Sequence, residues 1–145
     1  MKNLAMFFCL CLLVLGPSLS YPQAPVPNER FADRIPPILF EGLRQLANQN
    51  PEEAVKSWFH GSQMEGHSDP GLRQMLEHYG KYENFDPVSV QDLTPRLRVL
   101  YLALNFEKEP IIVKFVVYKT PDGWILLNYK IGVDEGNFET IASAH

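Results

Sequence analysis

Cysteine is nearly absent from the sequence of 145 residues: Cys9 and Cys11 are the only two, and both lie close to the start. Removal of that segment would leave no thiol, which excludes disulfides, thiol nucleophiles and cysteine metal sites. A basic excess is also missing, because 13 Lys and Arg stand against 17 Asp and Glu, a net charge of −4. Nucleic acid is therefore not expected as a partner, since phosphate neutralisation needs a basic patch. The 46% hydrophobic content excludes a disordered chain, and the length predicts one domain.

The first 20 residues have the composition of a secretory signal peptide. Lys2 gives a short positive head, residues 4–15 form an unbroken apolar run, and Ser18 and Ser20 are the small residues that a signal peptidase recognises. The run is shorter than the roughly 20 apolar residues of a membrane-spanning helix, so no stable membrane anchor is expected. Cleavage after Ser20 would make the net charge −5. No Asn-x-Ser/Thr site is present, which favours export to a bacterial periplasm or the exterior.

The remaining chain divides by composition into three parts. Residues 21–30 are rich in proline and predict an extended tether. Residues 31–133 carry the periodic apolar pattern of one folded domain, and residues 134–145 are expected to form a C-terminal tail. The sequence thus predicts a single exported domain.

Helical spacing of apolar residues characterises the first half of this domain. Asn50 and Asp69 are capping residues, each followed by a proline, and this order is typical of a helix start. Gly80 can end the last helix in a left-handed conformation. The expected helical stretches are 29–49, which Pro36 and Pro37 interrupt, 50–61 and 69–80.

The second half has the pattern of β-strands. Prolines mark off four apolar segments at the places where a missing N–H does little harm. The expected strands are 82–93, 96–106, 111–120 and 124–133. Helices followed by an antiparallel meander predict the α+β class, with the N-terminal helices packed on the sheet.

The last hairpin decides which side chains face the helices. A two-residue Asp-Gly loop would pair Pro121 with Trp124, whereas a three-residue Pro-Asp-Gly loop would pair Thr120 with Trp124. We favour the longer loop, because proline suits the first central position of a type I turn. That register also collects a wholly apolar set on one face: Val113, Phe115, Val117, Ile125, Leu127, Tyr129 and Ile131.

The opposite face mixes apolar, aromatic and charged residues. A monomer rarely leaves an apolar area of this breadth exposed to solvent, so we expect a homodimer through the sheet. Lys114 and Lys130 would lie directly opposite each other, which favours an acid or a bound anion between them. The expected interface residues are Val99, Tyr101, Tyr118, Trp124 and Leu126.

No catalytic, metal or cofactor motif is present. His60, His67 and His78 lack the spacing of a zinc site, and there is no nucleophile elbow or phosphate-binding loop. The acids of the second half fall at strand ends or turns, where Asp92 is the best remaining candidate for a general base. We therefore assign no catalytic residue, no metal and no cofactor.

Aromatic side chains gather near the boundary between the helices and the sheet. They fit two interpretations: packing of the core, or the lining of an apolar pocket that would bind a small apolar ligand. The six candidate lining residues are Trp58, Phe59, Tyr79, Tyr82, Phe115 and Tyr129.

Three stretches together resemble the NTF2-like (cystatin-like cone) superfamily, especially its small exported bacterial domains. They are the Ala-Val-x-x-Trp-Phe stretch, the Gly80-Lys81-Tyr82 helix end and the segment Lys-Thr-Pro-Asp-Gly-Trp-Ile-Leu-Leu-Asn-Tyr-Lys. The resemblance covers about residues 31–133. It implies a curved sheet wrapped around a long helix, a pocket at the mouth of the cone and dimers through the sheet.

The sequence also departs from this superfamily. The enzymes within it use a pocket Asp, and no acid lies in the interior of the last three predicted strands, so no catalytic residue carries over. Pro36 and Pro37 interrupt the expected first long helix, and the Gln-x-Val-x-Gly loop of cystatin inhibitors is absent. Three functions follow as hypotheses: a non-enzymatic dimer that binds a small apolar ligand or a protein, a ketosteroid-isomerase-like enzyme, and a purely structural or interaction domain.

Overall fold

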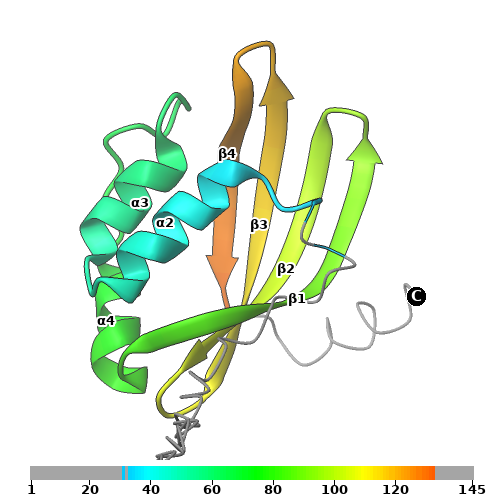
Figure 1. Cartoon of the computed structure of the whole chain (residues 1–145). Helices are drawn as coiled ribbons and strands as arrows, with labels where there is room; N and C mark the ends of the chain where they lie inside the picture. The colour runs from blue at the N-terminus through cyan, green and yellow to red at the C-terminus, as the bar shows by residue number, and fades with distance from the viewer. Residues whose placement is uncertain (1–30, 32, 133–145) are drawn as a thin grey trace, which may run out of the picture.

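The computed structural model describes residue 31 and residues 33–132. The predicted signal peptide, tether and tail lie outside these residues. Three helices, α2 (Pro37–Ala47), α3 (Pro51–Phe59) and α4 (Pro70–Tyr79), come before all four strands (Figure 1). The strands are β1 (Tyr82–Thr94), β2 (Leu97–Phe106), β3 (Pro110–Thr120) and β4 (Gly123–Ile131). The predicted α+β class is confirmed.

Each helix begins where its sequence provides the start. Pro37 lies in the first turn of α2. A backbone N–H in this turn has no partner within the helix, so the lack of an N–H in proline loses no hydrogen bond. The Asn50 side chain accepts a hydrogen bond from the amide of Glu53 at 3.4 Å and so caps α3. Asp69 caps α4 through the amide of Gly71, and Gly80 ends that helix with φ of +87°.

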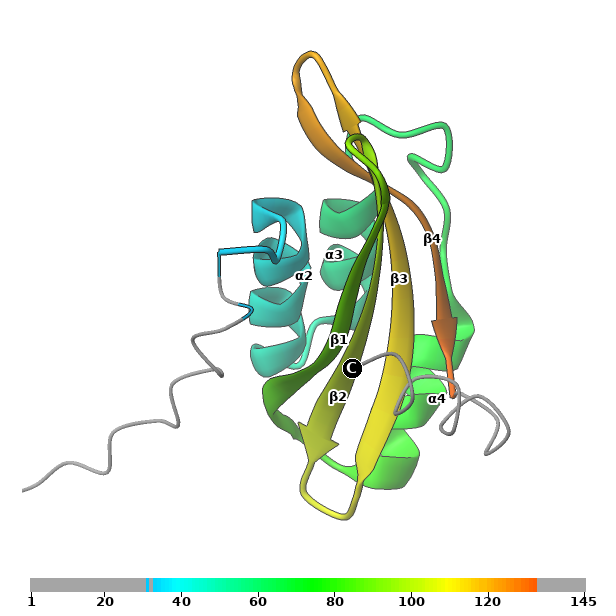
Figure 2. The ribbon, with the colours of Figure 1, turned by 90° about the vertical axis from the view of Figure 1, so that its right-hand side faces the viewer.

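The four strands form one antiparallel sheet in the order β1-β2-β3-β4. Three register irregularities interrupt the pairing of β1 with β2, and such bulges bend a strand and increase its twist. Helices α2 and α3 lie together on one side of the curved sheet (Figure 2). This arrangement is compatible with a cone-like fold.

The core lies between these helices and the sheet. Leu100, Leu102 and Leu104 alternate along β2 toward the helices and are fully buried. Trp58 and Phe115, from α3 and β3, are also fully buried. At about 25 cal/mol per Å² of apolar surface, this burial is the main stabilising contribution to a domain whose cysteines lie outside the described residues.

The opposite side of the sheet is referred to below as the outer face. Its members follow from strand alternation and from the pairing of β1 to β4. They are Asn84, Asp86, Ser89, Gln91, Leu97, Val99, Tyr101, Ala103, Asn105, Ile112, Lys114, Val116, Tyr118, Ile125, Asn128 and Lys130. The predicted placement of Val99, Tyr101 and Tyr118 on this face is confirmed, and Lys114 does lie directly opposite Lys130.

The tip of the last hairpin differs from both predicted loops. Thr120 pairs with Gly123, so only Pro121 and Asp122 form the turn. The predicted register applies only farther from the turn, where Phe115 pairs with Tyr129. A bulge between Leu126 and Asn128 joins the two registers by leaving Leu127 without a partner in β3.

The predicted positions of Trp124 and Leu126 on the outer face are therefore wrong, and so are those of Ile125 and Leu127 on the face toward the helices. Ile125 pairs with Tyr118 of the outer face. Leu126 is fully buried in the core and Trp124 packs against that core, whereas Leu127 is 42% exposed. The physical reason is that residues 124–127 are all apolar, so alternation along this segment cannot distinguish one face from the other. The bulge selects which of these residues face the helices.

None of the helices among the described residues is long and apolar enough to cross a membrane.

Candidate functional site

The six aromatic residues predicted to line a pocket fall into two groups of touching rings. In the larger group, Trp58 lies 5.3 Å from Phe115 and 5.5 Å from Tyr129, measured between ring centroids. Phe59 lies 5.8 Å from Tyr129. These separations are those of aromatic rings in direct contact, so the rings pack on one another at the centre of the domain.

A hydrogen bond and close packing against α2 fix the position of the Trp58 side chain. Its indole Nε1 donates a hydrogen bond to the carbonyl oxygen of Leu39 at 3.1 Å, which satisfies its only polar atom. Gly42 of α2 lies against the same ring: a Cβ at that position would be 2.0 Å from the indole Nε1. The close approach of α2 to α3 therefore depends on the absence of a side chain at residue 42.

The smaller group lies at the junction of α4 with the sheet. Tyr79 and Tyr82 both contact Phe106, with centroid separations of 6.4 Å and 5.8 Å. Burial, and secondarily the charge of Asp86, raises the pKa of Tyr82 above its ordinary value. Tyr82 is buried and packs its ring against Phe106.

Tyr129 connects the sheet to α4. Its hydroxyl donates to Oδ2 of Asp69, whose Oδ1 accepts from the amide of Gly71 at 2.8 Å. Burial, followed by the hydrogen bond with Asp69, raises the pKa of Tyr129. One carboxylate thus caps a helix and anchors a strand at the same time.

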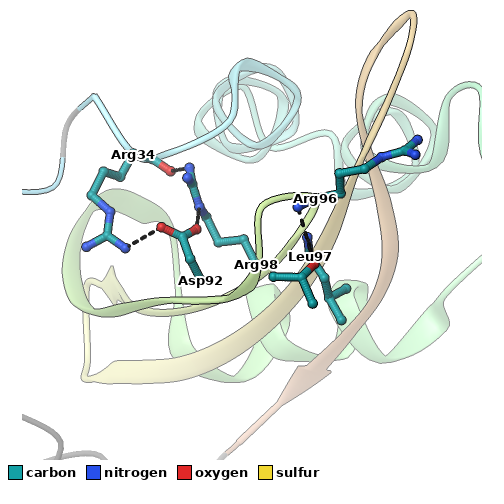
Figure 3. A network of polar contacts seen from close by, with 6 residues as sticks. Arg34, Asp92, Arg96, Leu97 and Arg98 are labelled. Carbon is teal, nitrogen blue, oxygen red and sulfur yellow. Dashed lines mark hydrogen bonds and ion pairs between the residues drawn. The ribbon is translucent and has the colours of Figure 1, made fainter.

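Asp92, the candidate general base, lies in a surface network of ion pairs (Figure 3). Its Oδ1 is 2.5 Å from Nε of Arg98, and its Oδ2 is 2.9 Å from Nη2 of Arg34. Hydrogen bonding from Arg98, more than from Arg34, holds the pKa of Asp92 below its usual range. The carboxyl is 42% exposed. An exposed carboxylate of low pKa that holds two arginines is a poor general base, so Asp92 ceases to be a catalytic candidate.

The same network fixes the segment that leads into α2. Nη1 of Arg98 donates to the carbonyl oxygen of Arg34, so one guanidinium contacts both Asp92 and this segment. Next to it, Thr94 Oγ1 accepts from the amides of Arg96 and Leu97 at 3.2 and 3.0 Å and shapes the β1–β2 turn. These contacts tie the start of the domain to the edge of its sheet.

Arg98 also places Trp124. Its guanidinium carbon lies 4.8 Å from the centroid of the Trp124 ring, within the range of a cation–π interaction. The indole is therefore held at the tip of the β3–β4 hairpin by a side chain that Asp92 holds in turn. Sequence reasoning did not identify this network, although the opposite charges of Asp92 and Arg98 across the predicted turn were a signal for it.

A groove of about 350 Å³ opens beside Trp124, and we refer to it as the hairpin groove. Ile38 of α2, His60 and Gly61 after α3, and residues 120 and 122–125 of the hairpin line it. The hairpin extends past the ends of α2 and α3, so the groove lies where helices and hairpin meet (Figure 1). The sequence did not predict it, because its walls come from three separate segments.

The outer face brings the remaining predicted residues together. Tyr101 and Tyr118 lie on it with partly exposed rings, and Nζ of Lys114 is 5.9 Å from the Tyr101 centroid. Val99 is only 7% exposed although it lies on this side of the sheet. A hollow of about 140 Å³ between Lys114 and Lys130 adds Val116, Asn128 and Tyr129 to its lining. Aromatic, apolar and positive groups thus share one surface.

Among the described residues, no three His, Cys, Asp or Glu side chains come together as potential metal ligands. His60 instead contacts a carboxylate, with its Nδ1 at 3.2 Å from Oε1 of Glu65. The sites to be considered for function are therefore the outer face and the hairpin groove.

Comparison with known proteins gives no match for this chain among family models, curated proteins or solved structures.

Proposed function

We propose that this chain is an exported, non-enzymatic domain of the NTF2-like superfamily that associates with a second copy of itself through the outer face of its sheet. The composition of residues 1–20 supports export. The order of helices and strands and the curved sheet support the superfamily. The observation that carries self-association is the half-buried apolar and aromatic surface formed by Tyr101, Val116 and Tyr118.

Packing of the interior favours an interaction domain over a carrier of a small apolar ligand. The rings of Trp58, Phe59, Phe115 and Tyr129 contact one another between the helices and the sheet. A ligand bound there would have to displace rings that already make favourable contacts with each other. The outer face requires no such displacement.

Charge on the outer face supports a second copy as the occupant. Asp86 lies on β1, at one side of the face, while Lys114 and Lys130 lie on β3 and β4, at the other side. A two-fold axis parallel to the strands places β1 of one copy over β4 of the other, which brings opposite charges together. Asp86 already accepts a hydrogen bond from Asn105 at 2.7 Å, so its carboxylate is oriented on this surface.

Multi-angle light scattering of the exported protein tests the proposal. We expect a mature mass that matches cleavage after Ser20, and a molar mass of two chains that falls with dilution. Tyr101→Glu should shift the equilibrium to monomer, because it places a charge at the centre of the contact. Leu93→Glu is the matched control: Leu93 is 57% exposed in the β1–β2 hairpin, away from the centre of the face, and its variant should remain dimeric.

A charge exchange tests the orientation of the two copies. Asp86→Lys alone should weaken the dimer about fivefold, as expected for loss of a rim ion pair with Lys130 on β4 of the other copy, and Asp86→Lys with Lys130→Glu should restore it. Circular dichroism verifies that each variant is folded. A parent protein that stays monomeric at millimolar concentration contradicts the proposal, as does a Tyr101→Glu variant with unchanged dimerisation.

A further inference from the structure

The hairpin groove has an apolar wall that ends in negative charge. Ile38 and Trp124 supply the apolar wall, and Trp124 is held in place by Arg98. Its volume of about 350 Å³ is at the lower end of the range for small-molecule pockets. The groove can therefore hold a molecule with one small apolar group.

Two features make the polar end of the groove favourable to a cation. Asp122, at the hairpin turn, contributes a carboxylate to the lining. His60 and Gly61 place the C-terminal end of α3 in the wall, where the carbonyl groups of a helix carry partial negative charge. A positive group in this place would interact favourably with both.

The charges around the groove add to this preference. No lysine or arginine is among its lining residues, and the His60 ring lies 3.2 Å from the carboxylate of Glu65. The nearby guanidinium of Arg98 is paired with Asp92 at 2.5 Å, a carboxylate that it shares with Arg34. Among the lining residues themselves, Asp122 carries the only full charge at neutral pH when His60 is neutral.

We propose that the hairpin groove binds a small organic cation, an amine attached to an apolar group, with the amine at Asp122 and the apolar group against Trp124. The indole offers the apolar group a large flat surface for packing, and the carboxylate supplies a charge-assisted hydrogen bond to the amine. The groove lies on the helix side of the hairpin. The proposal therefore does not depend on self-association through the outer face.

Titration with 2-phenylethylamine, followed by NMR of the tryptophan indole N–H signals, tests this proposal. The chain has two tryptophans, so the spectrum should contain two such signals, and Trp124→Phe assigns them. We expect the Trp124 signal to shift and saturate. The Trp58 signal is the internal control and should stay in place, because its N–H is buried and bonded to Leu39.

Matched ligands and variants separate charge recognition from apolar contact. The neutral 2-phenylethanol should bind at least fivefold more weakly than the amine, and Asp122→Asn should weaken amine binding about fivefold. Glu109→Gln makes the same change of charge at the opposite end of the sheet and should leave binding unchanged. The Tyr101→Glu variant should bind the amine like the parent, which keeps this result separate from that of the dimer.

Three results would overturn the proposal. They are equal affinities for the amine and the alcohol, an Asp122→Asn variant with unchanged amine affinity, and a Trp124 signal that does not move at the highest soluble concentration of the amine.

Discussion

At the scale of single residues, the ion pairs and hydrogen bonds of a side chain depend on partners that are distant in the sequence. Asp92 looks like an isolated turn acid in the sequence, but the fold gives it two arginines and lowers its pKa. Asp69 looks like a helix cap, and it is one, but it also accepts the hydroxyl of Tyr129 from the far end of the chain. Each of these two carboxylates joins segments that are far apart in the sequence.

Gly42→Ala provides a test at this scale. Alanine in an ordinary helix interior is more stable than glycine by about 0.5–1 kcal/mol. Here the new Cβ would lie 2.0 Å from the indole Nε1 and 2.3 Å from its Cδ1, so we expect a net loss of about 1–3 kcal/mol. Urea unfolding measures the change.

The control for this prediction is a second substitution at the clashing ring. Trp58→Phe removes the part of the indole that Gly42 contacts, so Gly42→Ala should be less destabilising in that background. If Gly42→Ala alone raised the free energy of unfolding, α2 would be able to move away from α3 with little loss of stability.

At the scale of elements, the β3–β4 hairpin determines which surfaces the protein presents. Its bulge turns Trp124 and Leu126 toward the helices and leaves Leu127 outside. The hairpin groove exists because Trp124 faces that way. For the same reason the outer face loses Trp124 and Leu126 and gains Ile125. One extra residue in a strand thus changes both candidate binding surfaces.

Two neighbouring leucines test the position of the bulge. Leu126→Ala should lower the free energy of unfolding by about 2–5 kcal/mol, because it leaves a cavity in the core. Leu127→Ala, the same change one residue later at a position 42% exposed, should lower it by less than about 1 kcal/mol. Chemical denaturation of both variants gives the comparison. The reverse order of effects would mean that the longer loop register extends to the hairpin tip.

At the scale of the whole molecule, stability at alkaline pH reflects two tyrosines in the core. The pKa values of Tyr82 and Tyr129 are raised above the ordinary value of 10.0, chiefly by burial. Above pH 10 the unfolded chain releases these protons while the folded chain keeps them. The folded state then binds more protons, so stability falls as pH rises.

We expect the contribution of these two tyrosines to the free energy of unfolding to be constant below pH 10 and to decline above it. Each tyrosine adds a slope of at most about 1.4 kcal/mol per pH unit, and partial exposure of Tyr129 reduces its share. The double variant Tyr82→Phe and Tyr129→Phe should decline less steeply between pH 10 and 11.5, as measured by urea unfolding at each pH. Parallel declines in parent and variant would assign the alkaline loss to other groups.

The sequence by itself determined the order of helices and strands and the core positions of β2 and β3. Capping residues and prolines act locally, so Asn50, Asp69 and Gly80 mark helix ends without help from the rest of the chain. Large apolar side chains recur at every second position of β2 and favour burial of that face, so Leu100, Leu102 and Leu104 were predictable core residues.

Only the tertiary structure decided which side of the sheet each residue of the hairpin tip faces, and which residues meet in the candidate sites. Residues 124–127 are all apolar, so either register would bury apolar surface, and packing against α2 and α3 selects one of them. Arg34 and Asp92 are 58 residues apart, and the hairpin groove has walls from three segments. Contacts between distant segments leave no periodic signal in a sequence, because they arise only when the elements pack together.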